Sequence, residues 1–316
     1  MVDSKRSWKA WIYLSPAILL LLVFTVWPII NTIRMSLLEN YSSMGAAGGQ
    51  VFEFGIGNFK QVLEYKDFIT CLKNTMLLCV LTVPISTLLA LLIAVCLNAI
   101  RPLQRLLQTI FFLPYVTNSI AIGMVFAAMF NMVGSAFGGE NEIIVTAGII
   151  NNVIEFFGGT RINWINVGSS YWANIFVMVV YIVWNALPFK ILILLGGLQS
   201  INKQYYDAAK VDGTPKGRVL TRITIPLLSP MLAYVIITGF IGGFKEYTSI
   251  VGIFGEKMQP PGASVSVPRL QTMVGFIYDN LGNAEGIASA AALLLFLLIF
   301  AVTLVNLAVS KKKTHY

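Results

Sequence analysis

The sequence predicts an all-α membrane protein with about six transmembrane helices, and three observations lead to this fold class. Hydrophobic residues make up 57% of the 316 residues, charged residues make up only 11%, and the mean hydropathy is +0.76. Soluble domains contain about 25% charged residues. Six apolar stretches are each long enough to cross a bilayer, which takes about 20 residues in a helix. Lysine and arginine gather in alternate connecting segments, as in proteins that cross a membrane repeatedly.

Each apolar stretch must form a helix because lipid cannot hydrogen-bond to exposed backbone groups. The predicted spans are Trp11–Ile33, Thr75–Leu97, Leu106–Phe130, Tyr171–Leu195, Met231–Phe254 and Gly286–Val309. The first stretch follows Lys5, Arg6 and Lys9, as the core of a secretory signal would. It is longer than the roughly 7–15 residues of such a core, and no small-residue cleavage site follows it. We therefore expect a retained first span and a single transmembrane domain over residues 1–316.

The basic residues predict the orientation of the spans. With the amino terminus in the cytoplasm, the inner segments contain thirteen Lys and Arg residues and three acids, and the outer segments contain seven Lys and Arg residues. The inner basic residues are Lys5, Arg6, Lys9, Arg101, Arg105, Lys203, Lys210, Lys216, Arg218, Arg222, Lys311, Lys312 and Lys313. Six crossings also place both basic termini on one side, so the two observations agree. The net charge of +8 is therefore interpreted first as a signal of topology.

The sequence lacks the motifs of common active sites and metal sites. Its one histidine, His315, lies in the tail, and no GxxxxGK[ST] phosphate-binding loop is present. The cysteines Cys71, Cys79 and Cys96 are odd in number, and the last two fall within one apolar stretch, so we expect packing residues and neither a disulfide framework nor a metal site. These features favour a chain that is not an enzyme and binds no cofactor of its own.

The connecting segment Gly196–Leu228 is the most informative part of the chain. Ser200 or Asn202 can cap a short helix at about Lys203–Val211. One face of this helix holds Ile201, Tyr205, Ala208, Ala209 and Asp212 at helical spacing. Gly213 then permits a sharp reversal, since glycine adopts positive φ at little cost.

Two prolines continue this pattern. Pro215 suits the first turn of a second helix, and Pro226 starts the next span. Together these signals predict a helix–turn–helix at the membrane face. The residues alone leave two interpretations open, an interfacial helix that lies on lipid headgroups or a docking surface for a partner protein.

The same segment resembles the EAA loop of permease subunits in binding-protein-dependent ABC importers, whose pattern is Glu-Ala-Ala-x3-Gly-x9-Ile-x-Leu-Pro. The matching residues are Asp207, Ala208, Ala209, Gly213, Ile223, Ile225 and Pro226. The spacing agrees throughout, and two residues depart from the pattern. Asp207 replaces the glutamate and Ile225 replaces the leucine, and the shorter acid predicts a weaker salt bridge with the ATPase.

The resemblance extends along nearly the whole chain and is to the sugar-uptake branch, that is, to maltose-type and glycerol-3-phosphate-type permeases. Further matching segments are Leu14-Ser15-Pro16-Ala17, Trp27-Pro28, Gly57-Asn58-Phe59, Phe68, Asn74-Thr75, Phe112-Leu113-Pro114, Trp184 to Phe189 and Leu194 to Ile201. The resemblance implies the type I importer permease (MetI-like) fold, with cytoplasmic EAA coupling helices and without a large extracytoplasmic insert.

The resemblance also implies partners and a mechanism. A cytoplasmic ATPase dimer would bind the loop and hold the ATP and Mg²⁺, so that this chain holds no cofactor. A second homologous permease, in the sugar branch usually a different chain, would complete the path, and an extracytoplasmic solute-binding protein would deliver the solute. The residues expected to couple the loop to the ATPase are Tyr205, Asp207, Ala208, Ala209, Asp212, Gly213, Ile223 and Pro226.

Ionisable residues inside spans are costly, so they are candidates for the solute path. Lys245 and Glu246 fall in the predicted fifth span and point about 100° apart on a helix, so one could line a cavity while the other pairs with a neighbour. The resemblance implies a cavity lining by Phe244, Glu246, Tyr247 and Ser249. The alternative is a shorter span with both charges at the outer interface. Asn185, in the fourth span, either lines the path or joins two helices by a hydrogen bond.

Two further predictions concern residues without a role in the path. Lys190 lies toward the cytoplasmic end of the fourth span, and we expect its ammonium to extend to the interface. We expect Gly123, Gly239 and Gly243 to permit close helix packing.

The sequence therefore predicts a permease subunit of an ATP-driven importer for a mono- or oligosaccharide, in the plasma or inner membrane. One alternative is an ABC permease for a peptide, an amino acid or a phosphate ester. Another is an ion-coupled secondary transporter, which would show more spans and more intramembrane acids. A membrane scaffold without transport would have no use for an EAA-like loop.

Overall fold

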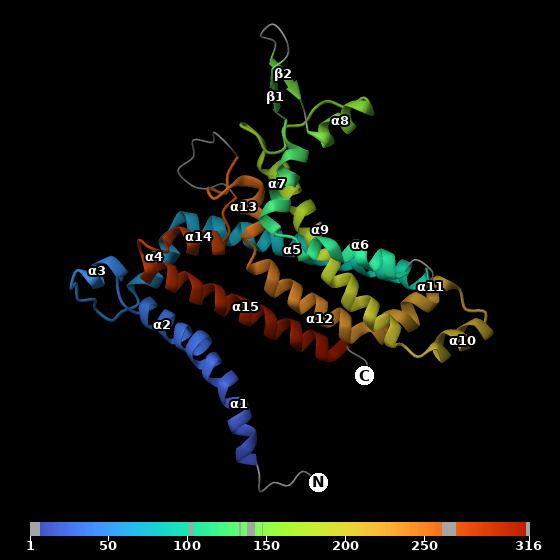
Figure 1. Ribbon diagram of the computed structural model, residues 1–316, viewed down its shortest axis with the longest axis horizontal. Coiled ribbons are helices and arrows are strands. Elements are labelled where there is room, and N and C mark those ends of the chain that lie inside the picture. Colours follow the sequence, from blue (N-terminus) through green and yellow to red (C-terminus); the bar gives the residue numbers. More distant parts are fainter. Residues whose placement is uncertain are drawn as a thin grey trace. The chain divides into compact units, whose positions relative to one another are not determined.

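The chain is described by a computed structural model that covers residues 7–100, 104–132, 134–137, 143–146, 148–260 and 270–313. Almost all of the secondary structure in these ranges is helical (Figure 1), which confirms the predicted fold class. An antiparallel hairpin of β1 (Gly134–Phe137) and β2 (Ile143–Thr146) adds two short strands that the sequence pattern did not predict. Lys5, Arg6, Arg101 and His315, named above, lie outside the described residues.

The helices fall into two compact units. The first unit runs to Phe68 and includes Phe276–Leu297. It contains α1 (Ser7–Leu21), η2 (Leu22–Val26), α2 (Trp27–Ser36), α3 (Ser43–Ala47), α4 (Gly57–Glu64), part of α14 (Met273–Asn280) and the first part of α15 (Glu285–Lys313). Asn58 is fully buried in this unit, and its amide donates to the backbone oxygens of Ser36 at 3.0 Å and Leu38 at 2.7 Å. The Gly-Asn-Phe motif therefore has a structural role here.

The second unit consists of Ile69–Gly275 and the residues from Leu298 onward. Its helices are most of α5 (Lys66–Ala99), then α6 (Gln104–Val116), α7 (Ser119–Phe130), α8 (Ile149–Phe156), α9 (Tyr171–Ser200), α10 (Lys203–Val211), α11 (Lys216–Val219), η3 (Leu220–Thr224), α12 (Ile225–Phe244) and α13 (Thr248–Phe254). Helix α9 is central, since half of its most apolar window is buried, against 11% for the helix that contains α12. One core cluster surrounds Tyr181 and another surrounds Leu194. Between these clusters, four residues of α9 line a cavity, namely Asn185, Ala186, Phe189 and Lys190.

Each π-helical turn precedes a proline. Proline lacks an N–H, and its ring clashes with the carbonyl four residues earlier. Segment η2 ends two residues before Pro28, and η3 ends two residues before Pro226. In both places the residue before the proline donates to the carbonyl five residues back, Trp27 to Leu22 and Ile225 to Leu220. The wider turn lets each helix continue through its proline.

Five helices of the described chain are long and apolar enough to cross a membrane, and a sixth span results if α6 and α7 are counted as one. The five are Trp11–Ser36, Lys66–Ala99, Tyr171–Ser200, Lys216–Phe244 and Glu285–Lys311. The pair α6–α7 is bent by 103°. The bend lies at Thr117–Asn118, where the Asn118 side chain accepts hydrogen bonds from the N–H groups of Ile120 and Ala121 and so starts a new helix.

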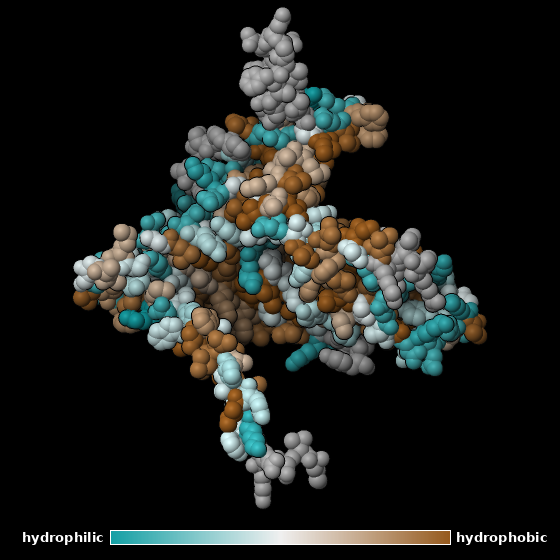
Figure 2. Space-filling model, in the orientation of Figure 1, coloured by the Kyte–Doolittle hydropathy of each residue, from teal (hydrophilic) through white to brown (hydrophobic). Residues whose placement is uncertain are grey.

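The predicted fifth span, Met231–Phe254, differs from the structure at both ends. The continuous helix already begins at Lys216, because the π-turn carries it through Pro226, and it ends at Phe244. Helix α13 follows after a break, so Lys245 and Glu246 lie between two helices and not within one. Figure 2 shows hydrophobic side chains over α6 and hydrophilic side chains gathered over α10 and α11.

Candidate functional site

A cavity of about 270 Å³ with several polar groups in its wall lies against α9 in the second unit. Helices α5, α6, α9 and α12 contribute to its wall, together with Glu246, which lies two residues after the end of α12. The lining residues are Thr82, Val83, Ser86, Tyr115, Ile182, Asn185, Ala186, Phe189, Lys190, Thr238, Gly239, Gly242, Gly243 and Glu246. Hydroxyl, amide and charged groups are costly at membrane depth. Their concentration in one cavity marks it as a candidate solute path.

Two aromatic rings form one side of the cavity. The rings of Tyr115 and Phe189 are stacked, with centroids 5.8 Å apart and planes inclined by 19°. Phe112 extends this group, with its ring centroid 5.3 Å from that of Tyr115. Tyr115 is 51% exposed, so this chain leaves the ring accessible. An accessible aromatic face beside hydroxyl and amide groups suits a solute that has both apolar and hydroxylated surfaces.

Lys190 contradicts the expectation that its ammonium reaches the interface. The residue is only 5% exposed. Its Nζ donates hydrogen bonds to Ser86 Oγ at 2.7 Å, Thr87 Oγ1 at 3.0 Å and the carbonyl oxygen of Val83 at 3.3 Å. Acceptors on α5 lie within reach of the side chain, so it turns across to that helix and contributes to the cavity wall.

Glu246 lines the cavity and also caps a helix. Its Oε1 accepts a hydrogen bond from the N–H of Ser249 at 3.2 Å, in the first turn of α13. Its backbone oxygen accepts from Thr272 Oγ1 at 2.9 Å. Lys245, by contrast, is exposed. The shorter span proposed as an alternative is therefore the one present, but only one of the two charges lies on the surface.

The other predicted path residues divide into two groups. Asn185 lines the cavity, and its amide also makes a long hydrogen bond, 3.4 Å, to Ser119 Oγ. Phe244 and Ser249 are each 2% exposed and are absent from the lining, as is Tyr247, which packs against the core cluster around Tyr181. The structure thus brings Asn185 and Glu246 to one cavity and places the other three outside its wall.

The connecting loop has the local structure that its sequence predicts. Helix α10 runs from Lys203 to Val211, and the Asn202 side chain accepts from the N–H of Gln204 at 3.0 Å. Gly213 has a φ of +64°. Its N–H donates to the Lys210 oxygen, and the N–H of Thr214 donates to the Ala209 oxygen at 2.9 Å. This pair of bonds is a Schellman motif, which closes the helix through a left-handed glycine.

The predicted face of α10 is divided between core and surface. Ala209 is 5% exposed, whereas Tyr205 is 54% exposed, and Val211, outside the predicted face, is 88% exposed. Ala208 and Asp212 are also exposed. Asp207 lies 3.9 Å from Lys210 Nζ, with both side chains largely in solvent. A surface that exposes apolar groups and a carboxylate on an ordered, capped helix suits contact with another protein.

A hydrogen bond connects α10 to the helix that lines the cavity. Tyr206 Oη and Thr224 Oγ1 lie 3.3 Å apart, and Thr224 is buried. Thr224 ends η3, the π-turn that also contains Ile223 and precedes Pro226. From there the helix continues into α12, whose far end supplies Thr238 and three glycines to the cavity. The loop is thus connected to the cavity wall through the Tyr206–Thr224 hydrogen bond, η3 and α12.

Residues 86–315 match the family described as "Binding-protein-dependent transport system inner membrane component". The chain belongs to this family. It is a permease subunit of an ABC importer, located in the membrane, and a transport component and not an enzyme. The match includes the whole connecting loop and most of the cavity wall.

Comparison with individual proteins supports this family assignment. The permease is 29% identical over 300 residues to the arabinooligosaccharides transport system permease protein of Halalkalibacterium halodurans, covering 94% of this chain and 86% of the relative. It is 30% identical over 246 residues to the lactose transport system permease protein of Rhizobium radiobacter, covering 77% and 74%. A bacterial ABC transporter involved in the import of the acidic polysaccharide alginate matches it in structure with a TM-score of 0.75 at 21% identity, covering 98% of each chain. This last match confirms the fold.

Sequence reasoning missed most of the cavity wall of the permease, including Lys190, Ser86 and Tyr115. A signal for the first was present, because Ile182, Ala186 and Lys190 recur every four residues and so lie on one face of α9. Ser86 and Tyr115 gave no such signal, since neither is charged at neutral pH and each lies on a different helix.

Glycines let the permease helices approach closely, as predicted. A Cβ at Gly123 would lie 2.7 Å from the Cα of Gly252, and one at Gly243 would lie 2.9 Å from Cys79 Sγ. A Cβ at Gly239 would meet Lys190 Nζ at 3.2 Å. A Cβ at Gly242 would meet nothing within 4 Å, so this position faces open space in the cavity.

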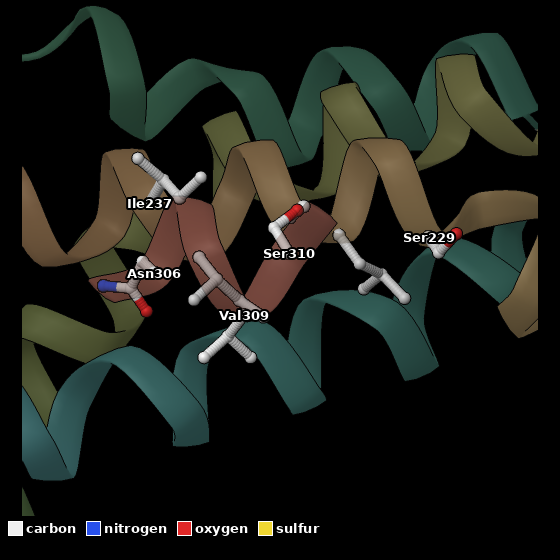
Figure 3. Close-up of a pocket in the computed structure, with 8 residues that line it drawn as sticks. Ser229, Ile237, Asn306, Val309 and Ser310 are labelled. Carbon is white, nitrogen blue, oxygen red and sulfur yellow. The ribbon is translucent and has the colours of Figure 1, made fainter. Parts of the chain in front are cut away.

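A second pocket of about 210 Å³ lies between α12 and the end of α15 (Figure 3). Ser229 and Ile237 come from α12, and Asn306, Val309 and Ser310 from α15. Leu232, Ala233 and Ile236 complete a mostly aliphatic wall. It offers a solute no charged or aromatic group, and we assign it no part in the path.

Proposed function

We propose that this permease carries a saccharide across the membrane through the cavity beside α9. One observation supports this best, the stacked Tyr115–Phe189 pair next to the Asn185 amide and the hydroxyls of Ser86 and Thr238. A sugar ring presents C–H groups on its faces and hydroxyls at its rim, and this wall offers a counterpart to both. The names of the relatives, which refer to arabinooligosaccharides and lactose, favour the same solute class.

We further propose that three kinds of partner complete the importer. A cytoplasmic ATPase dimer would bind the exposed face of α10, in a helix-in-groove contact. A second homologous permease, a different chain, would cover apolar surface such as that of Trp11–Ser36, in which none of the most apolar window is buried. An extracytoplasmic solute-binding protein would deliver the saccharide. The whole chain would act as one permease domain, with both termini in the cytoplasm.

The connection from α10 to the cavity supports a mechanism for alternating access. Closure of the ATPase dimer on ATP would move α10, and the Tyr206–Thr224 hydrogen bond would pass the movement to η3 and on to α12. Because α12 contributes Thr238 and Gly239–Gly243 to the cavity wall, its tilt would open or close the solute path. ATP must bind one of the two states more tightly, or it would shift no population.

The test is a reconstituted complex purified through a tag on this chain. Uptake and ATP hydrolysis would be measured with saccharides, amino acids, peptides and phosphate esters. We expect a response to saccharides, reduced about fivefold or more in Tyr115→Leu because leucine lacks the flat aromatic face, and a loss of about 1 kcal/mol of binding corresponds to roughly fivefold. Phe156→Leu is the matched control, since this ring is exposed on α8 outside the cavity. A response confined to non-saccharide solutes, or uptake by the chain without an ATPase, would contradict the proposal.

A further inference from the structure

We propose that the transported saccharide carries an anionic group and that Lys190 is the residue that binds it. This inference rests on the proposed function, because it assigns a charge to the solute of the same cavity. The anionic group could be a carboxylate, a phosphate or a sulfonate, which share the chemistry that an ammonium recognises.

The first support is the charge balance around Lys190. Its three N–H donors go to two hydroxyls and one carbonyl oxygen, all of them neutral. In the described ranges the ion pairs are Arg161–Glu155 and Lys210–Asp207, and both are exposed. The ammonium of Lys190 is thus hydrogen-bonded only to neutral groups. Among the described residues, no carboxylate lies within ion-pair distance of it. Buried charges are usually paired or bind a ligand, because removing a charge from water is costly.

The second support is the position of the ammonium on the cavity wall. Val83 and Ser86, which accept from Nζ, line the same cavity, as does Lys190 itself. Gly239 lies opposite, and the site of its absent Cβ is 3.2 Å from Nζ. A larger residue at position 239 would crowd the ammonium. The glycine therefore leaves room for the ammonium at this point of the cavity wall.

The third support is that the acid in the cavity has another task. The Oε1 of Glu246 accepts from the backbone of α13, and Glu246 makes no ion pair with Lys190. The cation is therefore the charge that remains to be compensated.

The hydrogen bonds also indicate how an anion would enter. Ser86 Oγ donates to the Thr82 oxygen at 2.5 Å and Thr87 Oγ1 donates to the Val83 oxygen at 2.7 Å, so both hydroxyls are oriented to accept from Nζ. The contact of Nζ with the Val83 oxygen, at 3.3 Å, is the longest of its three. An anionic oxygen would replace it and form a charge-assisted hydrogen bond, which is stronger than the neutral one. The two hydroxyls would keep the ammonium in place.

The test uses the permease–ATPase complex without the binding protein, so that the cavity alone discriminates. The probes are matched oligomers of glucose and glucuronate, and of galactose and galacturonate, from one to three units. Half-saturating concentrations are measured from the thermal stabilisation of the complex. For the unaltered complex we expect an acidic member to bind about tenfold more tightly than its neutral counterpart, the size of one charge-assisted hydrogen bond.

Three variants separate binding from structure. Lys190→Gln should abolish the preference for the acidic member over the neutral one, and Lys190→Arg should retain the preference. Lys245→Gln removes an exposed charge outside the cavity wall and should change nothing. Equal loss of acidic and neutral binding in Lys190→Gln would show that Lys190 only joins α5 to α9, and would overturn the inference.

The remaining outcomes are also decisive. If Lys190→Gln prevents assembly, the test rests on whether the unaltered complex prefers the acidic oligosaccharide to its neutral counterpart. Equal binding of the acidic and neutral oligosaccharides would overturn the inference and leave the proposed function intact. Stabilisation by none of the probes, in a complex that responds to amino acids or peptides, would refute the proposed function itself.

Discussion

The loop around α10 and the cavity beside α9 are built in opposite ways. The loop takes its shape from residues close in sequence, with Asn202 at one end of α10 and Gly213 and Thr214 at the other. The cavity takes its shape from side chains on four helices, which span the sequence from Thr82 to Glu246. The loop presents exposed groups, whereas the cavity encloses a buried cation. The caps and turns of the loop can therefore be recognised in the sequence, whereas the cavity can be identified only from the packing of the helices.

The two regions should also fail differently when altered. Changes in the loop act on backbone conformation and on the surface offered to a partner. Changes in the cavity act on packing distances and on the solvation of polar groups. The predictions below test this difference, beginning with the largest expected effect.

Replacing Gly213 with valine should have the largest effect on uptake. A Cβ at this position would meet nothing within 4 Å, so the penalty comes only from its φ of +64°. A β-branched residue in this conformation costs roughly 1–3 kcal/mol, and 1.4 kcal/mol corresponds to about tenfold in population. We expect Gly213→Val to lower uptake about tenfold or more and to weaken retention of the ATPase during purification.

Gly213→Asn is the matched control, because asparagine tolerates the left-handed region better than other residues. It should retain most of the uptake. If valine and asparagine were equally harmful, the turn geometry would not be the cause, and a direct contact of the glycine with the ATPase would have to be considered in its place.

Reversing the charge at Asp207 should have the next largest effect. Asp207→Arg leaves α10 intact, because the contact with Lys210 at 3.9 Å is exposed and contributes little to stability. It would place a cation where the proposed ATPase contact expects a carboxylate. We expect uptake to fall about fivefold to tenfold, which corresponds to roughly 1–1.4 kcal/mol lost from the contact with the ATPase. Glu64→Arg, at an exposed acid on α4, should leave uptake and ATPase retention unchanged.

Much of the fold could be predicted from the sequence because lipid restricts the alternatives. Apolar length predicts spans, and the bounds of α10 followed from its cap and its glycine. The bend at Asn118 was missed because a single capping residue hardly changes the composition of an apolar stretch, which therefore looks like an unbroken span. The end of α12 at Phe244 was predicted only as an alternative, because apolar residues continue past it into α13.

The cavity could be predicted less well than the loop. Glu246 and Asn185 were identified because polar residues in predicted spans are costly and are therefore candidates for the solute path. Lys190 was assigned to the interface because a long side chain near a helix end usually extends there. Its actual acceptors, Ser86 and Thr87, lie more than a hundred residues earlier in the chain, and their proximity is a result of packing.

A comparison of two glycines on α12 should give a smaller effect, in stability. A Cβ at Gly243 would lie 2.9 Å from Cys79 Sγ, whereas one at Gly242 faces open space. Overpacking costs about 1–3 kcal/mol, so Gly243→Ala should lower the thermal unfolding midpoint of the purified complex and Gly242→Ala should not. Adding Cys79→Ala to Gly243→Ala should restore part of the loss. Equal midpoints for the two single variants would show that α5 and α12 are not in close contact here.

The smallest effect is expected at Glu246, which lines the cavity but has a local task resembling that of Asn202 in the loop. Glu246→Gln keeps an oxygen that can accept from the Ser249 N–H, so stability and uptake should change little. Glu246→Ala removes the cap and should cost about 0.5–2 kcal/mol of stability. A large loss of uptake in Glu246→Gln at unchanged stability would mean that the carboxylate charge contacts the solute. The acid would then act in the path as Lys190 does, and a solute with both charges would have to replace the anionic saccharide.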